Sequence, residues 1–276
     1  MTDALPTIII IADSRGRGLD EFIDQHPESN RFNNIVKILP GRNLNQIAIE
    51  TIQSISGLNS QDYYCIILAG ICSLTEVTRI AGSKRIHYPL HSRDTKITDI
   101  TETIRDLKHR FADSINICTI IPASLTKYFK HYNPGKPLPE GLEQEQSALI
   151  DDINTINTEI INANSQTVTN INLSKRVLIQ SKKKKQRRTT ESYRRIFRFS
   201  DTELPDGVHF SDSLKSICFS LIYETAIRDL QHQSPPPPAA VINPYSSQDS
   251  QDLSRTLSGI LKERHPQLDE YFVLSI

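Results

Sequence analysis

Cysteine is scarce in this sequence: only four occur among 276 residues, and they lie far apart. No two of them form a Cys-x-x-Cys pair, the spacing typical of thiolate zinc sites, so we expect no zinc site. Cys65 and Cys118 fall within apolar runs typical of strands, where free buried thiols are common. The cysteine pattern therefore predicts a reduced, intracellular protein, either cytoplasmic or nuclear.

Signals for secretion and membrane insertion are also absent. Residues 1–3 carry no basic side chain of the kind that opens a secretory signal. The four isoleucines at 8–11 form a run too short for a signal core or a membrane span. No internal repeat is evident. With 37% hydrophobic residues, the length fits one globular α/β domain followed by a tail.

Apolar runs and helical stripes alternate along the chain. The predicted strands are 8–11, 35–39, 63–68, 115–121 and 167–173. Apolar residues that recur every three or four positions predict helices between them. The predicted helices begin near 19 and cover 44–55, 97–111, 149–160 and 214–230, with loops at 73–93 and 128–141. This alternation is typical of a three-layer, doubly wound α/β sandwich with a mostly parallel five-stranded sheet, as in flavodoxin-like folds.

The composition divides the chain into three parts. We expect a domain over 1–231, a Pro-rich linker over 232–251 and a short amphipathic helical tail over 252–276. Ser211 is a candidate N-cap for the last helix of the domain. The tail ends in apolar residues, which makes it a candidate surface for a protein partner.

The first predicted strand leads into a serine. Four β-branched residues in a row predict a strand buried on both faces, as in a parallel sheet. Ser14 follows at a strand-to-helix turn, with Gly16 and Gly18 close behind. Ligand sites of open α/β folds lie at this edge of the sheet. A simpler interpretation is that Ser14 caps the next helix.

A second block follows near the end of the domain, where Asp206 precedes His209 by three residues. Ser14, Asp206 and His209 together resemble the SGNH hydrolase superfamily, or GDSL-type esterases, over roughly the first 230 residues. In that family the nucleophilic serine follows the first strand, and the Asp and His share one late block. The resemblance implies a catalytic triad of these three residues. Alternatively, Asp206 is a turn residue in Pro-Asp-Gly, and His209 packs beside Phe210.

The resemblance also implies an oxyanion hole, which is incomplete in this sequence. The family uses the backbone N–H of the serine, a glycine N–H after the second strand and an asparagine side chain after the third. Ser14 and Gly41 match the first two positions. Cys72 stands where the asparagine is expected, with Ser73 beside it. A thiol is a poor hydrogen-bond donor, so Ser73 is a candidate substitute and Cys72 a small side chain lining the site.

A strongly basic insertion is predicted over 180–202. Between positions 175 and 198 there are eleven Lys or Arg and one acid, Glu191. Aromatic residues interleaved with cations can stack on bases while the cations neutralise phosphates. The candidate nucleic-acid-binding residues are Lys182, Lys183, Lys184, Lys185, Arg187, Arg188, Tyr193, Arg194, Arg195, Phe197 and Arg198. A nuclear-localisation signal and a solvated loop are the alternative interpretations.

Two functions follow as expectations. The first is a serine hydrolase that cleaves a small carboxylic ester through an acyl-enzyme, with no metal or organic cofactor. The second is a catalytically weak SGNH-like module that binds RNA, single-stranded DNA or a protein partner. Residues 12–18 and 69–72 resemble esterase-like domains encoded by animal retrotransposons, which supports the second expectation.

Overall fold

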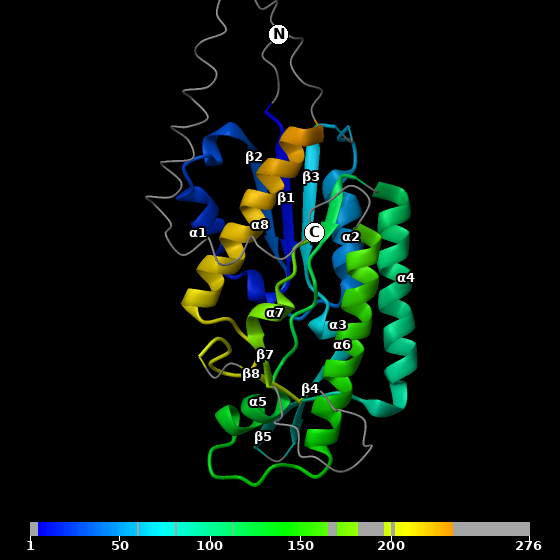
Figure 1. Ribbon diagram of the computed structural model, residues 1–276, viewed down its shortest axis with the longest axis vertical. Helices are drawn as coiled ribbons and strands as arrows, with labels where there is room; N and C mark the ends of the chain where they lie inside the picture. Colours follow the sequence, from blue (N-terminus) through cyan, green and yellow to red (C-terminus); the bar gives the residue numbers. More distant parts are fainter. Residues whose placement is uncertain are drawn as a thin grey trace, which may run out of the picture. The chain divides into compact units, whose positions relative to one another are not determined.

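The computed structural model describes residues 5–59, 61–80, 82–111, 113–164, 170–181, 196–199 and 202–233 (Figure 1). The chain divides into two units, Met1–Ser234 and Pro235–Ile276. All of the described residues belong to the first unit. The predicted linker and tail fall outside them, except for the last two residues of the final helix.

A parallel sheet of four strands forms the centre of the described unit. Its strands are β1 (Thr7–Ala12), β2 (Asn33–Ile38), β3 (Tyr63–Leu68) and β6 (Ile115–Ile117). They lie in the order β2-β1-β3-β6, so β1 pairs on both of its edges, with Ile9 opposite both Ile35 and Cys65. Every residue of β1 is buried. The predicted parallel α/β sheet is confirmed.

The two faces of the sheet pack against different helices (Figure 1). Ile9 and Ile11 of β1 face a core shared with α2 (Leu44–Ile55), α4 (Arg93–Phe111) and α6 (Leu142–Asn164). Ile8 and Ile10 face the core shared with α1 (Leu19–Asp24) and α8 (Asp212–Gln233). Alternate side chains of a strand point to opposite faces, so one short apolar run supplies both cores.

The strand predicted over 115–121 ends at Ile117. The Cys118 N–H still donates to Ile67 O of β3 at 2.9 Å, but the peptide groups after it bond elsewhere. The Thr119 N–H donates to Ile171 O at 3.1 Å. The Asn157 side chain accepts from the Ile120 N–H at 2.6 Å and donates to Ile120 O at 2.9 Å. Residues 170–173 form no strand, and 167–169 lie outside the described residues. The fifth strand is therefore not found in the described part of the chain.

The two predicted loops contain secondary structure. An antiparallel hairpin, β4 (Glu76–Ile80) and β5 (Ser83–His87), follows α3 (Ile71–Leu74), and α5 (Leu125–Tyr132) covers the start of the second predicted loop. The loop predictions were wrong there because distant contacts hold these elements. Asn133 bonds both backbone groups of Lys84, at 3.1 and 2.7 Å, and the Lys84 ammonium lies 3.9 Å from the Tyr132 ring centroid.

Short elements complete the unit. They are η1 (Ser14–Gly16), η2 (Ser29–Arg31), η3 (Leu90–Ser92), α7 (Ser174–Val177), β7 (Leu178–Ser181) and β8 (Ile196–Phe199). Strands β7 and β8 pair antiparallel at the two ends of the predicted basic insertion. Ser211 caps α8, as predicted, because its hydroxyl accepts from the Leu214 N–H at 3.1 Å. Among the described helices, none combines the length and the hydropathy that crossing a membrane requires.

We predict that Asn157→Leu destabilises the fold. Asn157 is 5% exposed and completes both hydrogen bonds of the Ile120 peptide groups. Leaving buried polar groups without partners is expected to lower the free energy of unfolding by about 2–4 kcal/mol. Urea denaturation measures this loss. The control is Asn154→Leu, one turn earlier on α6 and half-buried, which should change the stability by less than about 0.5 kcal/mol. Equal losses in both variants would contradict the assigned role of Asn157.

Candidate active site

Ser14 lies in η1, immediately after β1, at the carboxyl edge of the sheet. The capping role is filled by Asp13, whose carboxylate accepts from the Arg15 N–H at 2.9 Å. The turn is tight: a Cβ on Gly16 would lie 2.4 Å from the Ala12 Cβ. The half-buried Ser14 hydroxyl has no hydrogen-bond partner among the described residues, and it makes no hydrogen bond to His209. Ser14 is thus left free for a ligand and does not serve as a cap.

Asp206 and His209 form a hydrogen-bonded pair. The Asp206 Oδ2 lies 2.7 Å from the His209 Nδ1, and Oδ1 accepts from the backbone N–H groups of Val208 and His209 at 2.9 and 2.7 Å. Burial raises the pKa of Asp206, but these hydrogen bonds outweigh it and hold that pKa below its usual value. Asp206 is therefore an ionised carboxylate that orients the imidazole, and it also shapes the turn.

Gly207 fixes the position of this pair on the rest of the fold. Its φ is +86°, a conformation that favours glycine. A Cβ there would lie 2.5 Å from Ser124 O and 2.7 Å from Tyr128 N. The Ser124 N–H also donates to Gly207 O at 2.7 Å. The turn that carries His209 therefore packs directly on the backbone that leads into α5.

Arg15, which the sequence analysis did not single out, joins the two catalytic candidates. Its side chain is buried, with 4% exposure. The guanidinium donates to Val208 O at 3.1 Å, to Pro122 O at 3.4 Å and to Ile121 O. Val208 O belongs to the peptide bond that precedes His209. The residue after Ser14 therefore holds the backbone next to His209.

The charges around Ser14 interact with the His209 pair. Burial raises the pKa of Asp13, and Arg15 and His209 oppose that rise. Burial lowers the pKa of Arg15, while Asp13 and, more weakly, Asp206 oppose it. Both residues that flank Ser14 thus lie within electrostatic reach of the Asp206–His209 pair. The structure brings the Ser14 block and the Asp206–His209 block together, but it contains no hydrogen bond between Ser14 and His209.

Gly41 and Cys72, two of the three other predicted oxyanion positions, are neighbours. Gly41 has a φ of +75°, and its backbone amide acts on the Cys72 thiol, whose pKa it lowers. Burial, and then the charge of Asp13, raise the pKa of the half-buried Cys72 to about 11. The thiol is therefore protonated at neutral pH, which opposes a role as nucleophile.

Ser73 is engaged elsewhere. Its hydroxyl oxygen accepts from the Leu44 N–H at 2.7 Å, and its carbonyl accepts from the Lys96 ammonium at 3.4 Å. Leu44 is the first residue of α2, whose N-terminal N–H groups need acceptors. The hydroxyl thus stabilises the start of α2, which competes with the predicted role as an oxyanion donor.

The predicted nucleic-acid site lies mostly outside the described residues. Positions 182–195 are not described, and Phe197 and Arg198 fall on the backbone of β8. Within the described ranges, no three His, Cys, Asp or Glu side chains are grouped so that they could hold a metal ion.

Comparisons with known proteins give structural likenesses only. No protein-family model matches the sequence, and no curated protein does. A lipase/acylhydrolase from Enterococcus faecalis is 14% identical, with a TM-score of 0.48 over 84% of this chain and 100% of its own. An acetyl xylan esterase from Geobacillus stearothermophilus is 10% identical, with a TM-score of 0.44 over 84% and 97%. A psychrotrophic esterase from Pseudoalteromonas sp. is 10% identical, with a TM-score of 0.42 over 82% and 99%. At these values the likenesses establish no family, so a function has to follow from the residues of this chain.

We predict that Arg15→Met loosens the turn that carries His209. Loss of the guanidinium leaves buried carbonyls without donors, which should cost about 3 kcal/mol of unfolding free energy. The amides of Val208 and His209 should then exchange with deuterium faster, since the turn loses its anchor. The control is Arg31→Met, which removes an exposed arginine paired with Glu28 and should cost less than about 1 kcal/mol. Unchanged exchange at Val208 and His209 would refute the anchoring role.

Proposed function

We propose that the protein is a serine hydrolase of the SGNH type that cleaves carboxylic esters. The observation that carries this proposal is the Asp206–His209 pair, whose 2.7 Å hydrogen bond lies on a turn that Arg15 ties to the Ser14 turn. Ser14 is the nucleophile, His209 the base and Asp206 the residue that orients the base. The parallel sheet with Ser14 at its carboxyl edge supports the same assignment.

The reaction proceeds in two steps. The Ser14 Oγ attacks the ester carbonyl while the His209 Nε2 takes its proton, and Asp206 stabilises the imidazolium through Nδ1. The tetrahedral intermediate collapses as His209 returns the proton to the leaving alcohol, which gives an acyl-serine. Water, activated by His209, then releases the acid and restores Ser14. The free Ser14 hydroxyl has to turn toward His209 when substrate binds, as catalytic hydrogen bonds often shorten in the complex.

The oxyanion is stabilised by the backbone N–H groups of Ser14 and Gly41. The Gly41 backbone amide lies beside Cys72 and lowers the pKa of its thiol. The half-buried thiol supplies only a weak third donor. Because one missing oxyanion donor typically costs about 10²–10³ in rate, we expect slow turnover compared with a site that has all three.

Nucleic-acid or partner binding through the basic insertion stays a prediction from the sequence. Apart from Arg198 on β8, the insertion's cationic residues are outside the described part of the chain, as is the apolar tail. The likeness to retrotransposon-encoded domains is a prediction of the same kind. No contact among the described residues favours these functions over ester hydrolysis.

We predict that the protein releases 4-nitrophenol from 4-nitrophenyl acetate and that Ser14→Ala abolishes this release. His209→Ala should do the same, since it removes the base. The control is His232→Ala, which changes an exposed histidine near the end of α8 and should leave the rate unchanged. Initial rates are followed by absorbance. A wild-type rate equal to that of Ser14→Ala would contradict the proposed hydrolase function.

We further predict that Cys72→Asn raises kcat. An amide N–H beside Gly41 restores the third donor, and a rise of about tenfold or more is expected. Ser73→Ala serves as the companion variant. Because the Ser73 hydroxyl bonds the Leu44 N–H, this variant should lower the melting temperature and leave kcat unaltered. A fall in kcat for Ser73→Ala at unchanged stability would assign the donor role to Ser73 instead.

A further inference from the structure

Three exposed arginines lie at the same edge of the sheet as Ser14. Arg17 follows β1, Arg42 follows β2, and Arg79 lies on β4, which is reached after β3. The strand order β2-β1-β3 makes these three connections neighbours in space. Parallel strands end at one edge, so the sheet places Arg17 and Arg42 beside the candidate site, while Arg79 lies on the hairpin that follows β3 and α3.

The side chains of these arginines make no ion pair or hydrogen bond with any described residue. Elsewhere in the described unit, cations are commonly paired: Arg93 with Asp152, Arg85 with Glu145, and Lys37 with Glu50. Asp13 and Asp206, the carboxylates of the site, are buried and already hydrogen-bonded, and neither forms an ion pair with these arginines. No described residue therefore pairs with the three guanidinium groups.

Sequence position links Arg42 to the site, and charge links Arg79 to it. Arg42 directly follows Gly41, whose backbone amide acts on the Cys72 thiol. Arg79 acts on Tyr128: burial and Asp206 raise the pKa of this phenol, and Arg79 lowers it. Tyr128 is the residue on whose backbone Gly207 packs. The charge of Arg79 thus reaches the base of the turn that carries His209.

We propose that this site prefers esters that carry an anionic oxygen group, a carboxylate or a phosphate, on the acyl or the alcohol part. The inference rests on the proposed hydrolase function and specifies its substrate class. Guanidinium groups match the geometry of both anions, which they bind through paired N–H donors. An unpaired arginine loses no existing ion pair when such a substrate arrives.

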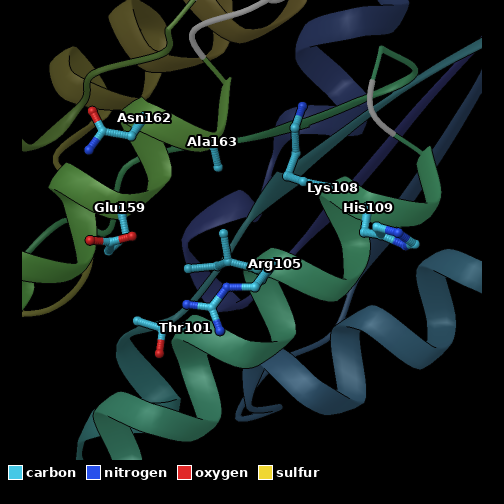
Figure 2. A pocket seen from close by; sticks show the side chains of 8 residues that line it. Thr101, Arg105, Lys108, His109, Glu159, Asn162 and Ala163 are labelled. Carbon is cyan, nitrogen blue, oxygen red and sulfur yellow. The ribbon is translucent and has the colours of Figure 1, made fainter.

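A groove of about 440 Å³ between α4 and α6 also carries cations, but nothing in it points to a ligand (Figure 2). Glu159 shares the groove with Arg105, and Figure 2 shows Lys108 and His109 directed away from one another. Lys108 donates to Ile115 O at 2.8 Å. Ile115 is the first residue of β6, so the end of the groove at Lys108 lies toward the amino edge of the sheet. Ser14 lies at the opposite, carboxyl edge. Arg105 in this groove makes no ion pair with a described residue and is a matched control.

The test compares two esters of equal chain length, 4-nitrophenyl butyrate and mono-4-nitrophenyl succinate, which differ by one terminal carboxylate. We expect a KM about tenfold lower for the succinate ester at low salt, a preference that weakens as salt screens the arginines. Arg17→Glu, Arg42→Glu and Arg79→Glu should each reduce the ratio of kcat/KM between the succinate and butyrate esters. Arg105→Glu should leave that ratio unchanged. Competitive inhibition by succinate or by inorganic phosphate distinguishes the two anion types.

The outcomes separate this inference from the proposed function. Hydrolysis of both esters with equal KM at every salt concentration overturns the anion preference and leaves the hydrolase standing. Hydrolysis of neither ester overturns the hydrolase. Calorimetric titration of Ser14→Ala with each ester then still decides the anion preference, because binding needs no nucleophile. Equal affinity for the two esters, or a ratio altered as much by Arg105→Glu as by the rim variants, overturns it.

Discussion

Pairing of β1 on both edges and burial of both its faces constrain everything else in this unit. A strand enclosed in this way can offer chemistry only at its ends. Its carboxyl end leads through Asp13 into Ser14, so the position of the proposed nucleophile is set by the main folding contacts of the domain. The neighbouring strands end beside it and supply Gly41 and Cys72. The direction of the strands thus places the candidate site at one edge of the sheet. Its geometry depends on the contacts that hold the connecting turns.

Arg15 keeps the turn that carries His209 in place. A buried guanidinium is costly unless it is well bonded, and here backbone carbonyls from two distant segments satisfy it. Asp13 balances its charge from the same turn. The site therefore combines a fixed half, in which Arg15 and Asp206 lock His209, with a half-buried serine whose hydroxyl is free. This division suits a reaction in which the nucleophile moves and the base does not.

Much of the fold was predictable because its signals are local. The β3 run at 63–68 is continuous and apolar, and the observed strand has the same bounds. The start of α4 at Arg93 was not predictable, since Arg93 is held by Asp152 of α6 at 2.6 Å. The β4–β5 hairpin escaped prediction for the same reason: Asn133 holds it. The Asp206–His209 pair could be predicted from its resemblance to a family motif, whereas the role of Arg15 depends on carbonyls more than a hundred residues away.

The Arg15 anchor also bears on how such a sequence can diverge. Its guanidinium lies over the Phe210 ring, and its hydrogen bonds go to main-chain oxygens of Val208, Ile121 and Pro122, which any residue type would present. Side chains at these three positions are therefore free to change as packing allows. The number of residues is not: an insertion between Pro122 and Ser124, or between Asp206 and His209, would carry a carbonyl out of reach. Sequence divergence in this part of the chain should therefore change residue types while the number of residues between these positions stays the same.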